Sequence, residues 1–352
     1  MISLLLLTVL GELQMVKKPP SLHAVTDTSV VLDTQIQRQG ELPFRFDAAD
    51  GGGGSGKDLG APQRLDGLTP DTAYTFSIGT SKDAIRGSFT TAPKPGSTRP
   101  FTFAVVGDSR DHGKRAELAH TIALSKPRFV LTTGDYVEDP KSEADWNDYY
   151  RAGFELFATV PVFAVMGNHD VGPLYDRYNS APKSSSGSTD FYSFTYGNAA
   201  FVAVDSNHLD ARQRAWLATE LPRLSGGPLF VFQHHPLYSC GQHGSSGQLQ
   251  EALQPLLEQA HVTAHFSGHD HDLIAWKPVR GVRYFISGGG GTHLYGLRHC
   301  EETTFSREGF GFMLVTVAGA QITARFLDEH GVELSKSAFA AASERLPVRA
   351  AP

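Results

Sequence analysis

Strand-length apolar runs recur in this chain from residue 101 onward, and they limit its fold more than any other feature. The first is "FTFAVVG", and later ones are "RFVLTTG", "PVFAVMG", "AFVAVD", "PLFVFQ", "VTAHFSG" and "YFISGG". Helix-like stretches at 113–126, 210–221 and 247–260 separate several of them. Runs that are apolar along their whole length are typical of strands buried on both faces. The alternation therefore predicts an α/β domain, which "FGFMLVTVAG" and "QITARFLD" would close as a hairpin.

Short polar clusters follow five of these runs. They contain Asp108 in "GDSRD", Asp135 in "GDYVED", Asn168 and His169 in "GNHD", His234 and His235 in "QHHP", and His269 and His271 in "GHDH". Any one of them alone is more often a turn, a helix cap or a solvated loop. In an open α/β sheet, however, the loops at the carboxyl ends of the strands meet at one crevice. The five clusters together therefore predict one shared site.

The residue types in these clusters suit a site with two metal ions. Carboxylate, imidazole and amide oxygen are ligands for ions such as Fe, Mn or Zn. One aspartate can bridge two ions that are roughly 3.5–4 Å apart, and such a pair can clamp a phosphoryl group and turn a bound water into hydroxide near neutral pH. The sequence therefore indicates metal-assisted chemistry on a phosphate ester.

The ordered set "GDSR", "GDYVED", "GNHD", "HHP" and "GHDH" resembles that of the calcineurin-like metallophosphoesterases. With the preceding β-rich region, "HHPLYSCGQHG" is most similar to the purple-acid-phosphatase branch. The resemblance implies an α/β (α+β) fold, namely a four-layer β-sandwich flanked by helices. It also implies hydrolysis of phosphate esters at a dinuclear centre of Fe, Mn or Zn, with a metal-bound hydroxide as nucleophile.

The resemblance also implies a role for each site residue. The first metal would be held by Asp108, Asp135 and His271, and the second by Asp135, Asn168, His234 and His269. His169 would donate to the leaving-group oxygen or steady the phosphoryl oxygens. His243, in "CGQHG", falls where the purple phosphatases carry an outer histidine near the substrate. The role of His235 stays open.

Two positions depart from the family pattern. Arg110 stands where many members have a metal-binding histidine, and a guanidinium cannot ligate a metal. It could instead bind phosphate oxygens with its fork of donors, or it could lie on the surface or pair with Asp111. Glu138 stands where the purple phosphatases carry a tyrosine, and its role is left open. The glycine run at 286–296 resembles the family's closing loop beside the metals.

The first part of the chain has a different pattern. Short β-like runs such as "SVVLDTQIQ" and "TAYTFSIGT" are separated by turn-rich stretches, including "GGGGSG", which we expect to be flexible. "LDGLTPDTAYTFSI" resembles the fibronectin type III signature, in which Tyr74 would close a sheet corner. The predicted domains are a fibronectin type III-like β-sandwich at 17–93, a linker at 94–100, a catalytic domain at 101–330 and a peripheral tail at 331–352.

Residues 1–16 resemble a signal segment. The apolar run Ile2–Leu10 is too short to span a bilayer, and no later segment has the pattern of a transmembrane helix. We therefore expect a secreted or periplasmic protein. A cytoplasmic location stays open, because no basic residue precedes the run and no A-x-A-like site follows it. Cys240 and Cys300 could form one disulfide, but the sequence does not show that they meet.

Composition narrows the function further. The formal net charge of −6 gives no broad basic surface for nucleic acid or anionic lipid. Two cysteines are too few for a typical zinc-thiolate site. The leading prediction is a phosphomonoesterase acting on a small-molecule phosphate ester. The alternatives are a phosphodiesterase acting on nucleotides or lipid head groups, and a non-catalytic extracellular binding module. The oligomeric state is not indicated.

Overall fold

The computed structural model describes residues 16–36, 42–49, 51–57, 61–79, 84–110, 113–182 and 184–341. The predicted signal segment therefore lies outside the described residues, apart from Val16. Among the residues described, no helix has both the length and the apolar character needed to cross a membrane.

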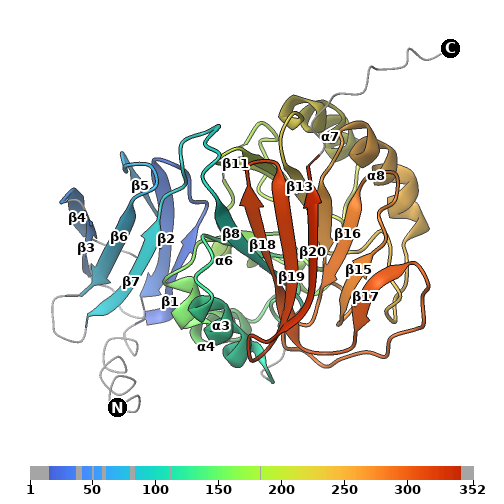
Figure 1. The fold of residues 1–352 in the computed structure, drawn as a ribbon. Coiled ribbons are helices and arrows are strands. Elements are labelled where there is room, and N and C mark those ends of the chain that lie inside the picture. Colours follow the sequence, from blue (N-terminus) through green and yellow to red (C-terminus); the bar gives the residue numbers. More distant parts are fainter. Residues whose placement is uncertain are drawn as a thin grey trace.

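Two large sheets face each other in the structure (Figure 1). The first has nine strands in the order β20-β19-β18-β8-β9-β10-β1-β2-β5. Its strands are β1 (Val16–His23), β2 (Ser29–Ile36), β5 (Gln63–Asp66), β8 (Phe101–Val106), β9 (Val130–Thr132), β10 (Val162–Ala164), β18 (Gly311–Ala318), β19 (Gln321–Asp328) and β20 (Glu333–Ala340). The second has seven strands in the order β11-β12-β13-β14-β16-β15-β17. Its strands are β11 (Tyr192–Tyr196), β12 (Ala199–Ala203), β13 (Leu229–Phe232), β14 (Ala264–Ser267), β15 (Leu273–Trp276), β16 (Arg283–Ser287) and β17 (Thr303–Arg307).

Helices cover the outer faces of both sheets. The helices packed on the nine-stranded sheet are α3 (Arg115–Leu124), α4 (Glu143–Ala152), α5 (Phe154–Phe157) and α6 (Tyr175–Tyr178). The seven-stranded sheet is covered by α7 (Ala211–Leu224) and α8 (Gly247–Gln259). A phenylalanine-rich core that includes Phe103, Phe129 and Phe201 fills the space between the sheets. The helix–sheet–sheet–helix order confirms the predicted four-layer α/β architecture.

Local sequence explains the two helices on the seven-stranded sheet. Asp210 and Ser246 cap α7 and α8, since their side chains accept hydrogen bonds from Gln213 N and Leu249 N. On α8, the residues Leu249, Leu253 and Leu257 recur every four positions, and all three are buried. This spacing gives the helix one apolar face, which packs on the sheet.

Parallel strand pairs bring the predicted polar clusters to one edge. β8, β9 and β10 pair in parallel in the first sheet, and β13, β14 and β16 pair in parallel in the second. The loops that follow β8, β9, β10, β13 and β14 carry the five clusters. Because the carboxyl ends of parallel strands point the same way, these loops meet at one end of the sandwich.

The N-terminal region contributes to both a small sheet and the large one. β3 (Pro43–Ala48), β4 (Gly53–Lys57), β6 (Ala73–Ile78) and β7 (Ile85–Thr90) form a four-stranded sheet in the order β4-β3-β6-β7. The Tyr74 hydroxyl accepts a hydrogen bond from Thr69 N at 2.8 Å, which is the corner contact expected from the sequence. β1 pairs in parallel with β10, so the nine-stranded sheet runs across the proposed linker at 94–100.

Two sequence predictions in these regions are wrong. The stretch "GGGGSG" is not a flexible turn, because Gly53–Lys57 forms edge strand β4. Glycine leaves room there for a packed ring, since a Cβ at Gly56 would lie 2.4 Å from the Phe44 ring and would displace it. The stretch after residue 330 is not merely a peripheral tail, because Glu333–Ala340 forms β20 and pairs with β19. Residues 342–352 lie outside the described part.

A buried ion pair joins the N-terminal strands to the helices of the catalytic region. The Lys18 ammonium pairs with Asp33, and both side chains are almost fully buried. It also donates to Tyr178 O at 3.2 Å and lies 4.1 Å from the centre of the Tyr150 ring. Burial lowers the pKa of Lys18, and the charge of Asp33 opposes that shift. The N-terminal region is thus a packed neighbour of α4 and α6.

A chain that starts at Lys94 tests what the N-terminal region contributes. We expect it to fold and bind metal, because every predicted ligand lies after residue 100. We also expect its midpoint of thermal unfolding to fall by roughly 10 °C, equivalent to ~3 kcal/mol. The reason is that β10 loses its pairing with β1 and Tyr150 loses its contact with Lys18. Circular dichroism and metal titration would measure both. Loss of metal binding in a folded chain would show that the N-terminal region shapes the site.

Candidate metal centre

The first group of candidate ligands consists of Asp108, Asp135 and His271. Their side chains are buried, and one ligand atom from each lies within 4.8 Å of the others. Asp108 Oδ1 lies 3.6 Å from His271 Nε2 and has no hydrogen-bond partner among the described residues. Burial, together with the charge of Asp135, raises the pKa of Asp108 well above its usual value. A buried carboxylate oxygen without a partner fits a site for a cation.

The second group surrounds His234 Nε2. This atom lies 2.9 Å from Asn168 Oδ1, 3.1 Å from His269 Nδ1 and 3.4 Å from Asp135 Oδ1. Asp135 therefore takes part in both groups. The structure brings all six predicted metal ligands together, and oxygen and nitrogen donors of this kind fit Fe, Mn or Zn.

Backbone carbonyls fix the orientation of two of the imidazoles. His234 Nδ1 donates to Thr133 O at 2.8 Å, and His271 Nδ1 donates to His293 O at 2.6 Å. In a neutral ring this leaves Nε2 with a lone pair directed into the site. Burial lowers the pKa of His234 well below its usual value and that of His271 to about 4. Both rings are therefore neutral near pH 7 and are able to ligate a metal.

The backbone at three of the ligands is left-handed. Asp108, Asp135 and His269 have φ angles of 63°, 59° and 72°. Such angles are uncommon for residues other than glycine, and residues that adopt them cluster at functional sites.

The glycines of the motifs allow the loops to approach closely. A Cβ at Gly167 would lie 2.2 Å from Asp135 Oδ1, and one at Gly268 would lie 2.3 Å from Asp108 Oδ2. The conformation of the loops therefore depends on the glycine in each motif.

Asp170 is a structural residue of the site that the sequence analysis did not identify. Its buried carboxylate accepts hydrogen bonds from the backbone N–H groups of Asp135, Tyr136 and Gly167 at 2.7–2.8 Å. Burial and the nearby charge of Asp135 raise the pKa of Asp170 to about 8. Asp170 therefore ties the loop of Asp135 to the loop that carries Asn168.

Asp270 and a disulfide position the loop of His243. Asp270, between the two histidines of "GHDH", accepts a hydrogen bond from His243 N at 2.8 Å and another from the Ser239 hydroxyl. Cys240 and Cys300 form a disulfide, which settles the pairing that the sequence left open. The His243 ring lies 4.2 Å from the His269 ring, measured between centroids. The loop thus holds His243 beside the second ligand group.

Arg110 occupies the space beside the first ligand group. Its side chain is only 4% exposed, so it is not a surface arginine. Its Nε lies 3.3 Å from Asp135 Oδ2, its Nη2 lies 3.4 Å from His271 Nε2, and its Nη1 lies 2.6 Å from His169 Nε2. A fixed positive charge therefore touches two of the three ligands of the predicted first metal.

Two tyrosines and Glu138 complete this side of the site. Glu138 is largely exposed and pairs with Arg110 at 3.3 Å. The Tyr136 hydroxyl points away from the ligands, because it donates to Val165 O at 2.7 Å. Tyr295, which the sequence analysis did not identify, stacks on His271 with 3.9 Å between ring centroids and hydrogen-bonds Arg110. The glycine run at 286–296 therefore brings an aromatic residue to the first ligand group.

The position of Arg110 predicts that the first metal binds more weakly than the second. A metal ion there would lie beside the guanidinium charge, so Arg110→Ala should increase the affinity for the weaker equivalent about tenfold or more, or ~1.4 kcal/mol. Calorimetric titration of the metal-free protein with Zn²⁺ would measure this. Arg64→Ala, on exposed β5, is the control. Unchanged or weaker binding in Arg110→Ala would contradict the prediction.

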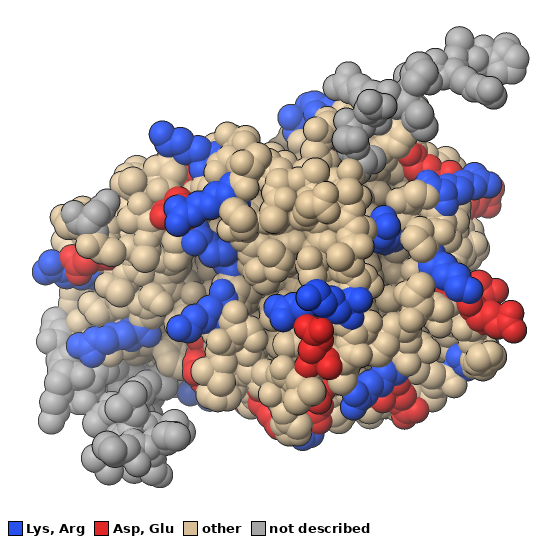
Figure 2. All heavy atoms as spheres, viewed as in Figure 1, with Lys and Arg blue, Asp and Glu red and all other residues tan. Residues whose placement is uncertain are grey.

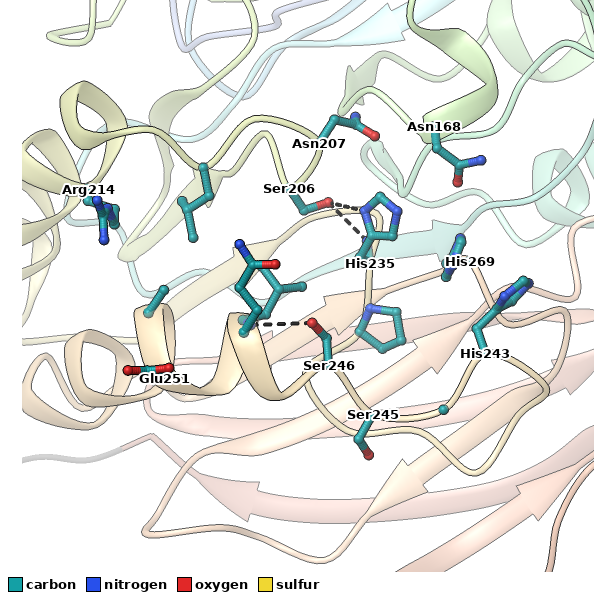
Figure 3. Close-up of a pocket in the computed structure, with 16 residues that line it drawn as sticks. Asn168, Ser206, Asn207, Arg214, His235, His243, Ser245, Ser246, Glu251 and His269 are labelled. Carbon is teal, nitrogen blue, oxygen red and sulfur yellow. Dashed lines mark hydrogen bonds between the residues drawn. The ribbon is translucent and has the colours of Figure 1, made fainter.

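A polar groove leads away from the second ligand group (Figure 3). Its volume is about 1090 Å³, and it begins at Asn168, His235, His243 and His269. The His235 Nδ1 lies 2.9 Å from the Ser206 hydroxyl, so this ring faces the groove rather than Arg110. His169 does not line the groove and contacts Arg110 instead. Of the two candidate catalytic histidines, His243 lines the groove and His169 contacts Arg110.

Comparisons with known proteins agree with this geometry. The sequence model of the calcineurin-like phosphoesterase family matches residues 101–273. Human tartrate-resistant acid phosphatase type 5 is 24% identical over 314 residues, which cover 73% of this chain and 94% of the relative. The Fe(3+)-Zn(2+) purple acid phosphatase 12 of Arabidopsis thaliana is 29% identical over 255 residues, covering 64% of this chain and 54% of the relative. The structure of the purple acid phosphatase PPD1 from yellow lupin superposes with a TM-score of 0.80 at 17% identity, covering 91% of this chain and 74% of the lupin chain.

The family match covers the strands and loops that carry all six candidate ligands. The interpretation as a non-catalytic binding module is set aside, because the homologues are phosphatases. The chain therefore contains a calcineurin-like phosphoesterase domain and is a phosphate ester hydrolase homologous to the purple acid phosphatases.

Proposed function

We propose that this protein hydrolyses phosphate monoesters at a centre of two metal ions that share Asp135. The observation that carries the proposal is the position of this carboxylate. Its Oδ1 lies 3.4 Å from His234 Nε2 in the second group, and Asp135 also belongs to the first group with Asp108 and His271. A relative is named for Fe(3+) and Zn(2+), and the donor types here suit that pair. When bound, two such ions would activate water near neutral pH and neutralise phosphoryl charge.

Arg110 and His169 are proposed to bind the phosphoryl oxygens. Both lie on the same side of the ligand groups, with Arg110 Nη1 2.6 Å from His169 Nε2. The guanidinium adds a buried positive charge, which suits the dianion of a monoester better than the single charge of a diester. Of the two roles that the sequence suggested for His169, this position favours contact with the phosphoryl oxygens over protonation of the leaving group.

His243 is proposed to act on the leaving group. It lines the groove next to His269, and the groove is the space in which the rest of a substrate can lie. Its backbone is held by Asp270, and its loop is held by the Cys240–Cys300 disulfide. We propose that its imidazole protonates the ester oxygen as the phosphorus–oxygen bond breaks.

The disulfide also supports an exported protein. Structural disulfides persist in oxidising compartments and are rare in the cytosol. We therefore propose that the protein works outside the cytoplasm, in agreement with the signal-like residues 1–16. On the face shown in Figure 2, the basic side chains of the described residues are interspersed with acidic ones. A small phosphate ester suits this surface better than a polyanion does.

A substrate panel tests the proposed function. The protein, loaded with Fe, Mn or Zn, would be assayed on nitrophenyl phosphate and on bis-nitrophenyl phosphate. We expect kcat/KM to be higher for the monoester and to fall to background after chelation. A higher kcat/KM for the diester would favour the phosphodiesterase, and absence of turnover of both esters would contradict the proposal.

A further inference from the structure

The groove beside the second ligand group is much larger than a phosphate group requires. Its volume of about 1090 Å³ reaches the size of pockets that enclose a whole drug-sized ligand. It extends from His243 and His269 to the first turns of α7 and α8, where Arg214 and Glu251 lie (Figure 3). If phosphate binds at the histidine end, the remaining length is available to the leaving group. The side chains that line the groove can therefore indicate the chemical class of that leaving group.

The far end of the groove presents hydrogen-bonding side chains that have no partner in the described part of the protein. Gln248 and Glu251 lie three residues apart on α8 and so share one face, and Arg214 approaches from α7. Nearer the histidines, Ser206 and Ser245 also line the groove. Arginine only donates, carboxylate only accepts, and amide and hydroxyl groups do both. The far end of the groove thus offers donors and acceptors without a described partner, whereas the Ser206 and Ser245 hydroxyls already hydrogen-bond within the protein.

The chemistry of this lining discriminates between classes of leaving group. A hydrocarbon chain would make no hydrogen bond to these exposed side chains and would displace water from those that it covers. At the far end of the groove a flat nucleobase would find only the Arg214 guanidinium to stack on, since the described residues that line the groove include no Phe, Tyr or Trp and its histidines lie at the end next to the metal ligands. A hydroxyl both donates and accepts, so several hydroxyls on a small ring match the lining best.

We infer that the leaving group of the substrate is a polyhydroxylated molecule of sugar size, which binds in the groove between α7 and α8. This inference rests on the proposed function, because it takes the phosphoryl end of the substrate to be at the metal ligands. Arg214, Gln248 and Glu251 are the residues that would determine specificity, and none of them belongs to the ligand groups.

A pair of matched six-carbon esters tests the inference. For the metal-loaded protein we expect kcat/KM to be about tenfold or more higher for glucose 6-phosphate than for n-hexyl phosphate, because a site that hydrogen-bonds hydroxyls rejects analogues without them. Adenosine 5′-monophosphate tests a leaving group with a flat base, and its kcat/KM should be lower than that of glucose 6-phosphate. A preference for hexyl phosphate or for the nucleotide would overturn the inference.

Substitutions in the groove test whether its side chains cause the preference for a polyhydroxylated leaving group. Ala252→Trp places a large ring in the groove and should lower the ratio of kcat/KM for glucose 6-phosphate over methyl phosphate by about tenfold or more. Glu251→Gln keeps the size of the side chain, and Arg214→Gln removes the charge with a shorter side chain; each should lower the ratio several-fold. Ala215→Trp, exposed on α7 and outside the groove lining, is the control and should leave the ratio unchanged.

The outcomes separate this inference from the proposed function. If nitrophenyl phosphate is hydrolysed but the three groove variants keep the wild-type ratio, the inference fails and the proposed function stands. If the metal-loaded protein hydrolyses no ester at all, both fail together. If Ala252→Trp does not fold, the two glutamine variants decide, because they change only the far end of the groove.

Discussion

Replacing Asp135 by asparagine should lower kcat for phosphate monoesters by roughly 10³-fold or more while the fold is kept. Asp135 belongs to the group of Asp108 and His271 and also lies 3.4 Å from His234 Nε2, so its negative charge would allow two cations to lie close together. Asparagine has the same shape, and its amide oxygen can still accept the hydrogen bond that Asp135 Oδ1 accepts from His169 N at 3.0 Å. Steady-state kinetics on nitrophenyl phosphate, together with metal analysis, would measure the effect.

Thermal unfolding of the same variant separates loss of charge from loss of fold. Asp66→Asn, at an exposed position on β5, is the matched control and should behave as the wild type. We expect Asp135→Asn to bind fewer than two metal ions per chain because the negative charge is lost. We also expect it to unfold cooperatively, which would show that the fold is kept. Near-normal turnover in this variant would show that Asp135 does not bridge two metals.

The second large effect concerns the two histidines outside the ligand groups. His243→Ala should lower kcat by roughly 10²–10⁴-fold for alkyl phosphates, whose leaving oxygen needs a proton, and much less for nitrophenyl phosphate. His169→Ala should lower kcat for both esters by a similar factor, because His169 contacts Arg110 and is proposed to bind the phosphoryl oxygens with it. A series of esters with increasing leaving-group pKa, assayed on both variants, would separate the two roles.

The slopes of these series identify the acid. A steeper dependence on leaving-group pKa in His243→Ala than in the wild type is the expected result, with an unchanged slope in His169→Ala. The reverse pattern would assign protonation of the leaving group to His169 and would remove the role proposed here for His243. His208→Ala, exposed and outside the groove lining, is the control for a lost imidazole.

The sequence predicted the sheet strands and the meeting of the polar clusters at one edge because both depend on local patterns. Apolar runs of strand length such as "FTFAVV" form β8, and the polar residue that follows each run lies at the carboxyl end of a strand. Parallel pairing then brings the ends together, although the residues are far apart in the chain. Asp108 and His271 are 163 positions apart, yet Asp108 Oδ1 lies 3.6 Å from His271 Nε2.

The supporting acids Asp170 and Asp270 were missed for a physical reason. Each accepts hydrogen bonds from backbone N–H groups of a different loop. Every residue except proline has such a group, so the sequence does not show which one will donate. Both lie next to a predicted ligand, in "GNHD" and "GHDH", and that adjacency was the only available signal. The place of Arg110 against Asp135 also follows from how the loops meet, which the spacing of the motif does not give.

Long-range pairing explains the remaining errors. Nothing in β1 indicates that it pairs with β10, because the two strands lie on opposite sides of the proposed linker. β20 was not predicted, since "ELSKSAFA" has little apolar alternation, and it is held by pairing with β19. In β4 the glycines that suggested flexibility instead make room for the rings of Phe44 and Phe46. In each case the partner strand decides the structure, not the local propensity.

Titration of metal-free protein with Zn²⁺ or Mn²⁺, while turnover of nitrophenyl phosphate is followed, tests the two-metal centre most directly. The account predicts that two ions bind per chain, that the ion at the first ligand group binds more weakly because of Arg110, and that most of the activity appears as this weaker site fills. Full activity with one ion per chain, or activity that persists after complete chelation, would contradict it.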